Sequence, residues 1–190
     1  MAEQRGYWNE SDGSAVDAAT AHDRWAQDAY GVLTEIATEY GGLITYGELA
    51  ELVQEDSGIR TSVQQHHWIG KVLSRVVAEA HAEGVPPLTA LVVRKDTGLV
   101  GEAYAEVLAT EGAPVLDDVL ASERHAAGAR LRCYEYFGAD LPPGGGVPTL
   151  APEFAAKVAR LQRTREVPVG TPCPNCFVIM PASGVCDTCG

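Results

Sequence analysis

The sequence is short of positive charge, of aromatic side chains and of long apolar runs. Its 190 residues include 14 Lys and Arg against 26 Asp and Glu, a formal net charge of −12, and only 7% of its residues are aromatic. No run approaches the ~18 apolar residues of a membrane-spanning helix, and residues 1–13 lack the apolar core of a secretory signal. We therefore expect a cytoplasmic protein with no membrane partner. The acidity argues against broad, nonspecific attraction to nucleic acid, which needs a positive surface.

The charge is distributed unevenly along the chain. Residues 1–40 carry 8 acids and 2 bases, residues 41–150 carry 15 and 8, and residues 151–190 carry 3 and 4. A dense Pro/Gly cluster at 141–148 separates the acidic part from the slightly basic end and is typical of a linker. This pattern predicts five segments: a flexible N-terminus over 1–13, a body over 14–140, a linker over 141–151, a helix with a basic stripe over 152–170 and a cysteine-rich module over 171–190.

Apolar spacing predicts a mostly helical α+β body. A stripe that includes Trp25, Ala29 and Leu33 indicates a helix between Ser14 and Tyr40. Thr45 and Glu48 have the spacing of a capping box, which starts a short second helix. Further helices are expected from Thr61 or Ser62 to Glu83, from Leu116 to Phe137 and from Pro152 to Arg165, and a polar loop is expected over 54–60.

A strand, a turn and a second strand are expected after the third helix. Leu88–Val93 is a short apolar run, Asp96–Gly98 is a turn signal, and Leu99–Val100 can start a partner strand. Three helices followed by a hairpin is the order of a winged-helix domain. The predicted fold is therefore a winged-helix-like body followed by a C-terminal four-cysteine module.

Four of the five cysteines form two CxxC pairs, Cys173–Cys176 and Cys186–Cys189, separated by nine residues. Two such pairs can close a tetrahedron around one ion, and this module resembles a short zinc ribbon with one structural Zn²⁺. Two disulfides and a thioredoxin-type redox pair are the alternatives; the expected cytoplasmic location disfavours the first and the missing βαβ frame the second. Cys133 is expected to be a buried core thiol.

Residues 42–105 resemble the DNA-binding domain of alkylguanine-DNA alkyltransferases and their inactive alkyltransferase-like relatives. The resemblance lies in Ile44–Ala50 (ITYGELA), Ile69–Leu73 (IGKVL) and Leu99–Tyr104 (LVGEAY). It implies a helix-turn-helix with a recognition helix, in which Tyr46 matches the family's tyrosine. The family's helix arginine falls at His67, and its Pro-Cys-His-Arg motif is absent from the matching 87–90 region. The resemblance therefore implies DNA contact and excludes alkyl transfer.

Two groups of residues are candidate contacts to nucleic acid or a partner. Lys157, Arg160 and Arg163, with Arg165 nearby, lie along one side of the last helix, as phosphate-contacting or simply solvated side chains. The start of the third helix offers a second group, which a solvent-exposed helix start also explains. On an α-helix, neighbouring histidines point about 100° apart and cannot face one site. The second group, including the tyrosine of the resemblance, is Tyr46, Gln65, His66, His67 and Lys71.

These features leave three functions open. The first is a non-enzymatic, zinc-containing DNA-binding or transcription-associated protein whose partner is duplex DNA. The second is an adaptor, in a phage or defence system or on a polymerase, that docks its acidic body on a larger protein machine or mimics DNA. The third is an unrecognised enzyme or nuclease accessory, although the sequence carries no familiar catalytic motif and indicates no small-molecule substrate. The isolated His22, His81 and His125 are expected at the surface.

Overall fold

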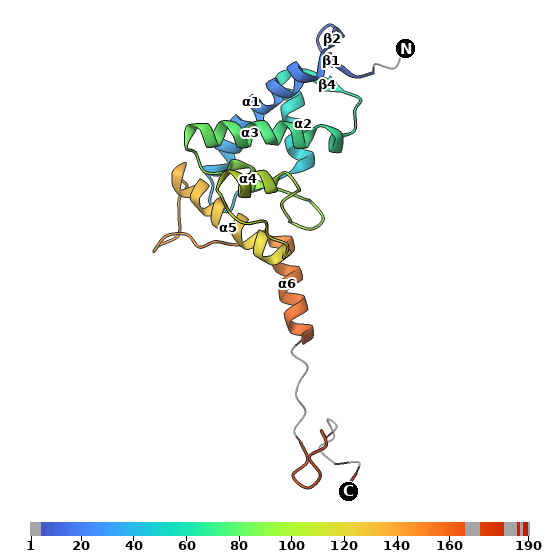
Figure 1. Cartoon of the computed structure of the whole chain (residues 1–190), viewed down its shortest axis with the longest axis vertical. Coiled ribbons are helices and arrows are strands. Elements are labelled where there is room, and N and C mark those ends of the chain that lie inside the picture. Colours follow the sequence, from blue (N-terminus) through green and yellow to red (C-terminus); the bar gives the residue numbers. More distant parts are fainter. Residues whose placement is uncertain (1–4, 166–171, 181–185, 187, 190) are drawn as a thin grey trace. The chain divides into compact units, whose positions relative to one another are not determined.

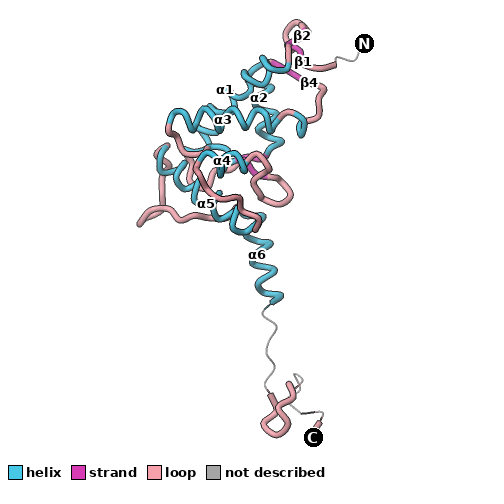
Figure 2. Tube along the Cα trace, in the orientation of Figure 1, coloured by secondary structure: helices cyan, strands magenta, loops and turns pink. Residues whose placement is uncertain are grey.

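The computed structural model describes residues 5–165, 172–180, 186 and 188–189. The chain divides into two compact units, residues 1–154 and residues 155–190. The described part is mostly helical and contains two small sheets (Figure 1 and Figure 2). The predicted α+β class is therefore confirmed. No helix in the described ranges is both long and apolar enough to cross a membrane.

Three helices form the core of the first unit: α1 (Ala18–Ala37), α2 (Tyr46–Ser57) and α3 (Ile69–Glu83). The α1 stripe is buried through Trp25, Ala29 and Leu33, as the apolar spacing predicts. The Trp25 and Trp68 rings pack with centroids 4.3 Å apart. These apolar faces pack on one another, and their burial supplies most of the driving force for folding.

Helix α2 begins as predicted and ends later than predicted. Thr45 and Glu48 form the complete capping box. The helix runs on to Ser57 and stops at Gly58, whose φ of 66° lies in the left-handed region that glycine tolerates best. The expected loop over 54–60 is thus wrong, because the polar residues there occupy the solvent side of a longer helix.

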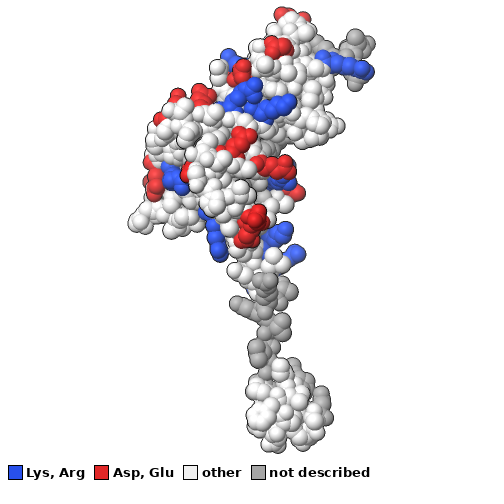
Figure 3. Space-filling view, viewed as in Figure 1, with Lys and Arg blue, Asp and Glu red and all other residues white. Residues whose placement is uncertain are grey.

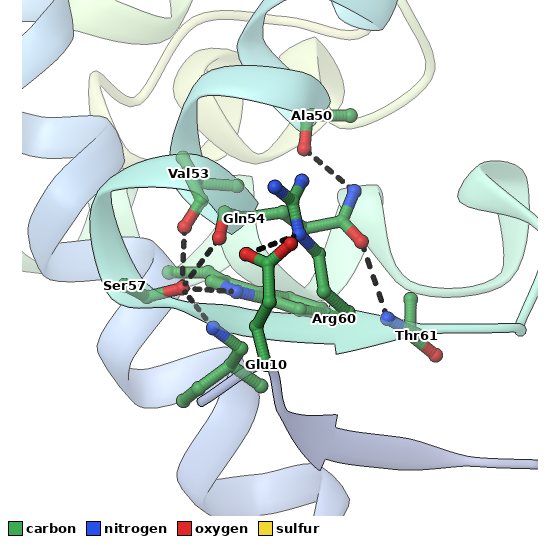
Figure 4. A network of polar contacts seen from close by, with 9 residues as sticks. Glu10, Ala50, Val53, Gln54, Ser57, Arg60 and Thr61 are labelled. Carbon is green, nitrogen blue, oxygen red and sulfur yellow. Dashed lines mark hydrogen bonds and ion pairs between the residues drawn. The ribbon is translucent and has the colours of Figure 1, made fainter. Parts of the chain in front are cut away.

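The end of α2 is tied to strand β4 (Ile59–Thr61) by side-chain hydrogen bonds (Figure 4). The Ser57 hydroxyl donates to the Val53 carbonyl at 2.6 Å and accepts from the Trp25 indole N–H at 3.0 Å. The Gln54 amide donates to the Ala50 carbonyl, and its oxygen accepts from the Thr61 N–H. This network fixes where the chain leaves the helix.

A hairpin begins within residues 5–13, which are the described part of the segment predicted to be flexible over 1–13. Strand β1 (Tyr7–Asn9) pairs antiparallel with β2 (Ala15–Val16) and with β4 (Figure 1). The Tyr7 side chain links this hairpin to α1, because its hydroxyl lies 3.1 Å from Nε2 of His22. His22 is 4% exposed, so its expected surface position is wrong. An aromatic neighbour distant in sequence gives no local signal for either feature.

The second sheet joins β3 (Ile44–Thr45) to β5 (Val92–Val93) in parallel. The predicted strand over 88–93 is mostly a buried 3₁₀ turn, η2 (Leu88–Leu91). Leu99–Val100 forms no strand; the Arg94 N–H instead donates to the Leu99 carbonyl and closes a loop. The expected two-stranded wing is therefore a loop, and β5 pairs instead with β3, the strand directly before α2.

Two more helices complete the first unit: α4 (Tyr104–Thr110), which the sequence analysis missed, and α5 (Val119–Tyr136). Glu123 on α5 is buried; its carboxylate accepts from the Val100 N–H at 2.6 Å and from Nη2 of Arg130 at 3.2 Å. The hydrogen bond between Val100 and Glu123 holds the loop that contains Arg94–Gly101 against α5.

The Pro/Gly segment contains no helix or strand over 141–150, as predicted, but it lies on the first unit. The Tyr40 hydroxyl donates to the Val147 carbonyl and accepts from the Val147 N–H. Helix α6 (Pro152–Arg165) follows with the predicted bounds. Ala151 and Phe154 are buried, so the compact first unit extends past the predicted end of the body at 140.

Candidate nucleic-acid groove and metal centre

Two adjoining cavities line the surface where α2 and α3 begin. The larger has a volume of about 570 Å³ and the smaller about 350 Å³. They share a wall of four residues, and we call them together the groove. The shared residues are His66, Gly70, Glu102 and Ala103.

The groove brings together the second group of predicted contact residues. Tyr46, Gln65 and His66 line the larger cavity, and His66, His67 and Lys71 line the smaller one. These residues come from the starts of two helices that are separated by about twenty residues in sequence. Their meeting depends on the packing of both α2 and α3 against α1, which the sequence analysis did not specify.

The floor of the groove is held by Tyr46. Its hydroxyl oxygen accepts a hydrogen bond from the Gly101 N–H at 2.9 Å, and its carbonyl accepts from the Gln65 amide. Burial raises the pKa of Tyr46, so its phenol stays protonated at neutral pH. A Cβ at position 101 would lie 2.2 Å from the Tyr46 hydroxyl, so only glycine allows this close approach.

Open space in the groove lies above Gly47 and Gly70. A Cβ at position 70 would meet no atom within 4 Å, and one at position 47 would meet only the Thr45 hydroxyl, at 3.9 Å. The glycines therefore leave room at the start of each helix, where backbone N–H groups and the helix dipole favour a negative ligand.

His66 and His67 lie together, contrary to the expectation that they diverge. They belong to a 3₁₀ turn, η1 (Gln65–His67), and not to the α-helix. Their ring centroids are 4.0 Å apart, and both rings line the smaller cavity. A 3₁₀ turn has about 3.0 residues per turn, which separates neighbouring side-chain directions by about 120°, so the backbone does not bring the two rings together and the side-chain torsions must do so.

Positive charge without an acidic partner collects at the groove. Five arginines of the first unit pair with carboxylates within 4 Å. Lys71, Arg94 and Lys95 line the groove and form no ion pair with any residue that the structure describes. Lysine and arginine side chains gather over the part of the body that carries α3 (Figure 3).

Two acidic side chains partly offset the positive charge of the groove. Glu102 and Glu106 also line the groove, and Glu106 accepts a hydrogen bond from the Ser74 hydroxyl at 2.7 Å. Three formal positive charges against two negative ones leave the groove slightly positive in a chain of net charge −12. Such a surface can bind an anion locally without attracting polyanions broadly.

Sequence reasoning missed Arg94 and Lys95. A signal was present, because they are the single pair of adjacent Lys or Arg residues in the sequence and stand directly before a turn. Their place in the groove follows from the parallel pairing of β5 with β3, which delivers the loop beside Tyr46. That pairing has no local sequence signature.

The first group of predicted contacts lies on the part of α6 that belongs to the second unit. Lys157, Arg160 and Arg163 are exposed, which fits both interpretations of the stripe. Arg165 ends the helix, and its side chain lies outside the described residues.

The four cysteines of the two CxxC pairs meet in one cluster. The sulfur atoms of Cys173, Cys176, Cys186 and Cys189 all lie within 4.8 Å of one another. Four of the Sγ–Sγ separations are 3.3, 3.4, 3.5 and 3.4 Å, far longer than the ~2.05 Å of a disulfide. A single metal site predicts that all four sulfurs meet, whereas two disulfides or two redox pairs would not require it.

Backbone N–H groups point at the first sulfur of each pair. Those of Asn175 and Cys176 lower the pKa of Cys173, and those of Thr188 and Cys189, together with the Cys176 side chain, lower that of Cys186 to about 6. In both pairs, backbone N–H donors two and three residues further along the chain thus stabilise a thiolate at the first cysteine.

The donor set fits a metal ion. Four sulfurs at the ~2.3 Å Zn–S distance on a tetrahedron are about 3.8 Å apart, close to the separations observed. Cys173, Cys176, Cys186 and Cys189 would hold the ion with no position left open, which is the arrangement of a structural site. A metal would supply much of the folding free energy of so small a module.

Cys133 is buried on α5, as predicted. Burial raises the pKa of its thiol to about 12, so it stays protonated and unreactive at neutral pH.

No protein-family model, curated protein or solved structure matches the chain. The geometry described above is therefore the basis for any functional conclusion.

Proposed function

We propose that the protein is a non-enzymatic, zinc-containing nucleic-acid-binding protein whose groove contacts duplex DNA. One observation carries this proposal: five residues singled out from the sequence, Lys71 among them, line two joined cavities together with Arg94 and Lys95. The groove would contact phosphate through these three cations, while Tyr46, Gln65 and His66 offer hydrogen bonds to bases. The winged-helix interpretation belongs to the same proposal, with α3 as the recognition helix and the loop containing Arg94–Gly101 in place of a wing.

Two further observations support a binding role without catalysis. The alkyltransferase cysteine is absent, and the one cysteine outside the CxxC pairs, Cys133, is buried and protonated. The tetrahedral spacing of four sulfur donors favours zinc, the ion that such sites usually hold.

Salt-dependent binding tests the groove. Fluorescence anisotropy should detect binding of a labelled duplex at low salt. The logarithm of the association constant should then fall linearly with the logarithm of the salt concentration, with a slope of about −3 for three phosphate contacts. Lys71→Gln should reduce the slope by about one. Arg124→Gln is the matched control, because Arg124 is exposed on α5 and lines neither cavity. Equal losses in both variants would contradict the proposal.

A steric test avoids any change of charge. Gly70→Leu places a side chain in the open space of the groove and should abolish binding, whereas Gly70→Ala should bind normally and fold at least as stably. The absence of duplex binding by the wild-type chain at low salt would refute the proposal outright.

Metal content is tested separately. Native mass spectrometry should show one zinc per chain, and Cys176→Ser should remove it. The first unit should melt at the same temperature in both proteins, because its core contains none of the four ligands. A zinc content of zero in the wild-type chain would refute the metal assignment and leave the groove untouched.

A further inference from the structure

The loop that forms one wall of the groove rests on a segment that is distant in the sequence. We call residues 94–101 the groove loop. Residues 94–96 are exposed, whereas Gly98 is buried. A Cβ at position 98 would lie 3.1 Å from both the Ala151 Cβ and the Phe154 nitrogen, and the φ of Gly98 is 66°. The start of α6 therefore covers the middle of the groove loop so closely that only glycine fits there.

Hydrogen bonds hold the groove loop at its ends but not in its middle. Strand β5 directly precedes it, and the Val100 and Gly101 N–H groups donate to side chains of α5 and α2. Among the residues that the structure describes, no hydrogen bond or ion pair joins 95–99 to another segment. The packing of Gly98 against the start of α6 thus supplies a support that hydrogen bonds do not.

The start of α6 belongs to a segment with few attachments to the first unit. We call residues 146–154 the strap. Its buried residues are Ala151 and Phe154, which are 1% and 6% exposed. The Tyr40 hydroxyl makes its two hydrogen bonds to Val147 at 3.2 and 3.3 Å. Between these two points the strap borders a cavity of about 170 Å³, so that it packs incompletely. Phe154 is the largest side chain that holds the strap in place.

We propose that the strap positions the groove loop, with Phe154 as the positioning residue. While Phe154 is buried, the start of α6 supports Gly98 and thereby fixes Arg94 and Lys95 at the groove. Without this support the middle of the groove loop moves, and the two cations lose their fixed positions. The role of the two cations rests on the proposed function, whereas the docking of the strap on the groove loop does not. The affinity of the groove thus depends on a residue that lines neither of its cavities.

A merely stabilising role is the alternative for Phe154, because any buried side chain contributes to the stability of the first unit. A loss of global stability speeds the exchange of those amides that open only when the whole unit unfolds. A positioning role predicts faster exchange in the groove loop, through local opening that does not involve the core helices. Hydrogen exchange therefore separates the two roles.

Hydrogen exchange on the full-length chain is the first test. Phe154→Ala should speed exchange in the groove loop by about ten-fold or more, and Phe154→Leu, which keeps an apolar anchor, should stay within about three-fold of wild type. Ile59→Ala is the matched control, because Ile59 on β4 is 7% exposed and lines neither cavity of the groove. It should speed exchange in α1 and α3 but not in the groove loop.

Tyr40→Phe gives a second variant that does not depend on the folding of Phe154→Ala. It removes both hydrogen bonds to Val147 and creates no cavity, and it should speed exchange in the groove loop by about two- to five-fold. Wild-type exchange of the groove loop in Tyr40→Phe and in folded Phe154→Ala would overturn the proposal. The same increase in Ile59→Ala would also overturn it.

Duplex binding gives a further readout that a stabilising role would not change. In Phe154→Ala the salt slope should fall in magnitude from about −3 to about −1, because Arg94 and Lys95 no longer keep their positions. Ile59→Ala should retain the wild-type slope below its melting temperature. A wild-type slope in Phe154→Ala would overturn the positioning role. The absence of binding by the wild-type chain would refute the proposed function alone, because the exchange comparison uses no nucleic acid.

Discussion

Glu123 is the residue whose removal should damage the first unit most. Its carboxylate and the Arg130 guanidinium are 1% and 3% exposed and lie 3.2 Å apart. Glu123→Ala leaves a buried guanidinium without its carboxylate, which costs about 3–5 kcal/mol in the free energy of unfolding. For a unit of this size the melting temperature should fall by about 10 °C. The buried Val100 N–H loses its acceptor in the same step.

Urea unfolding followed by tryptophan fluorescence measures this loss, since all three tryptophans belong to the first unit. The control is Glu111→Ala, because Glu111 pairs with Arg132 near the surface and should contribute less than about 1 kcal/mol. A Glu123→Leu/Arg130→Met double variant should recover at least half of the loss. If Glu123→Ala is no less stable than Glu111→Ala, the buried-charge argument is wrong.

Three further predictions concern single residues. Burial lowers the pKa of His22 from 6.5, so that below pH 6.5 the unfolded chain binds more protons than the folded one. The urea midpoint of unfolding should therefore decrease as the pH is lowered from 7 to 5, and it should decrease less in His22→Gln. Thr45→Ala removes the side-chain half of the capping box and should cost about 1 kcal/mol in urea, whereas an unchanged midpoint would mean that the cap is dispensable. Gly101→Ala should displace the Tyr46 ring and weaken duplex binding more than it weakens stability; binding equal to wild type would show that this contact does not shape the groove.

The sequence predicted those features that depend on neighbours along the chain. The α1 stripe, the Thr45–Glu48 box and the end of the third helix at Glu83 each need only a few adjacent residues. The cluster of four cysteines was predicted for the same reason, because a CxxC spacing is itself a local geometry.

Features that need distant partners were missed. Tyr7 is ordered by His22 and by β4, and β5 pairs with β3 across two intervening helices. The groove also depends on distant partners. Some of its residues were predicted one by one from the sequence, but Arg94 and Lys95 reach it only through the parallel pairing of β5 with β3. Periodicity within one segment says nothing about which segments meet.

The bond between Glu123 and the Val100 N–H has a consequence for synthesis on the ribosome. The loop that forms one wall of the groove is held by a residue of α5, a helix that ends at Tyr136. A nascent chain of which only α1 to α4 have left the ribosome therefore contains the residues of the groove but not Glu123, which holds this loop in place. We expect the groove to take its final shape only after α5 has left the exit tunnel, which would delay the proposed contact with nucleic acid until the first unit is almost complete.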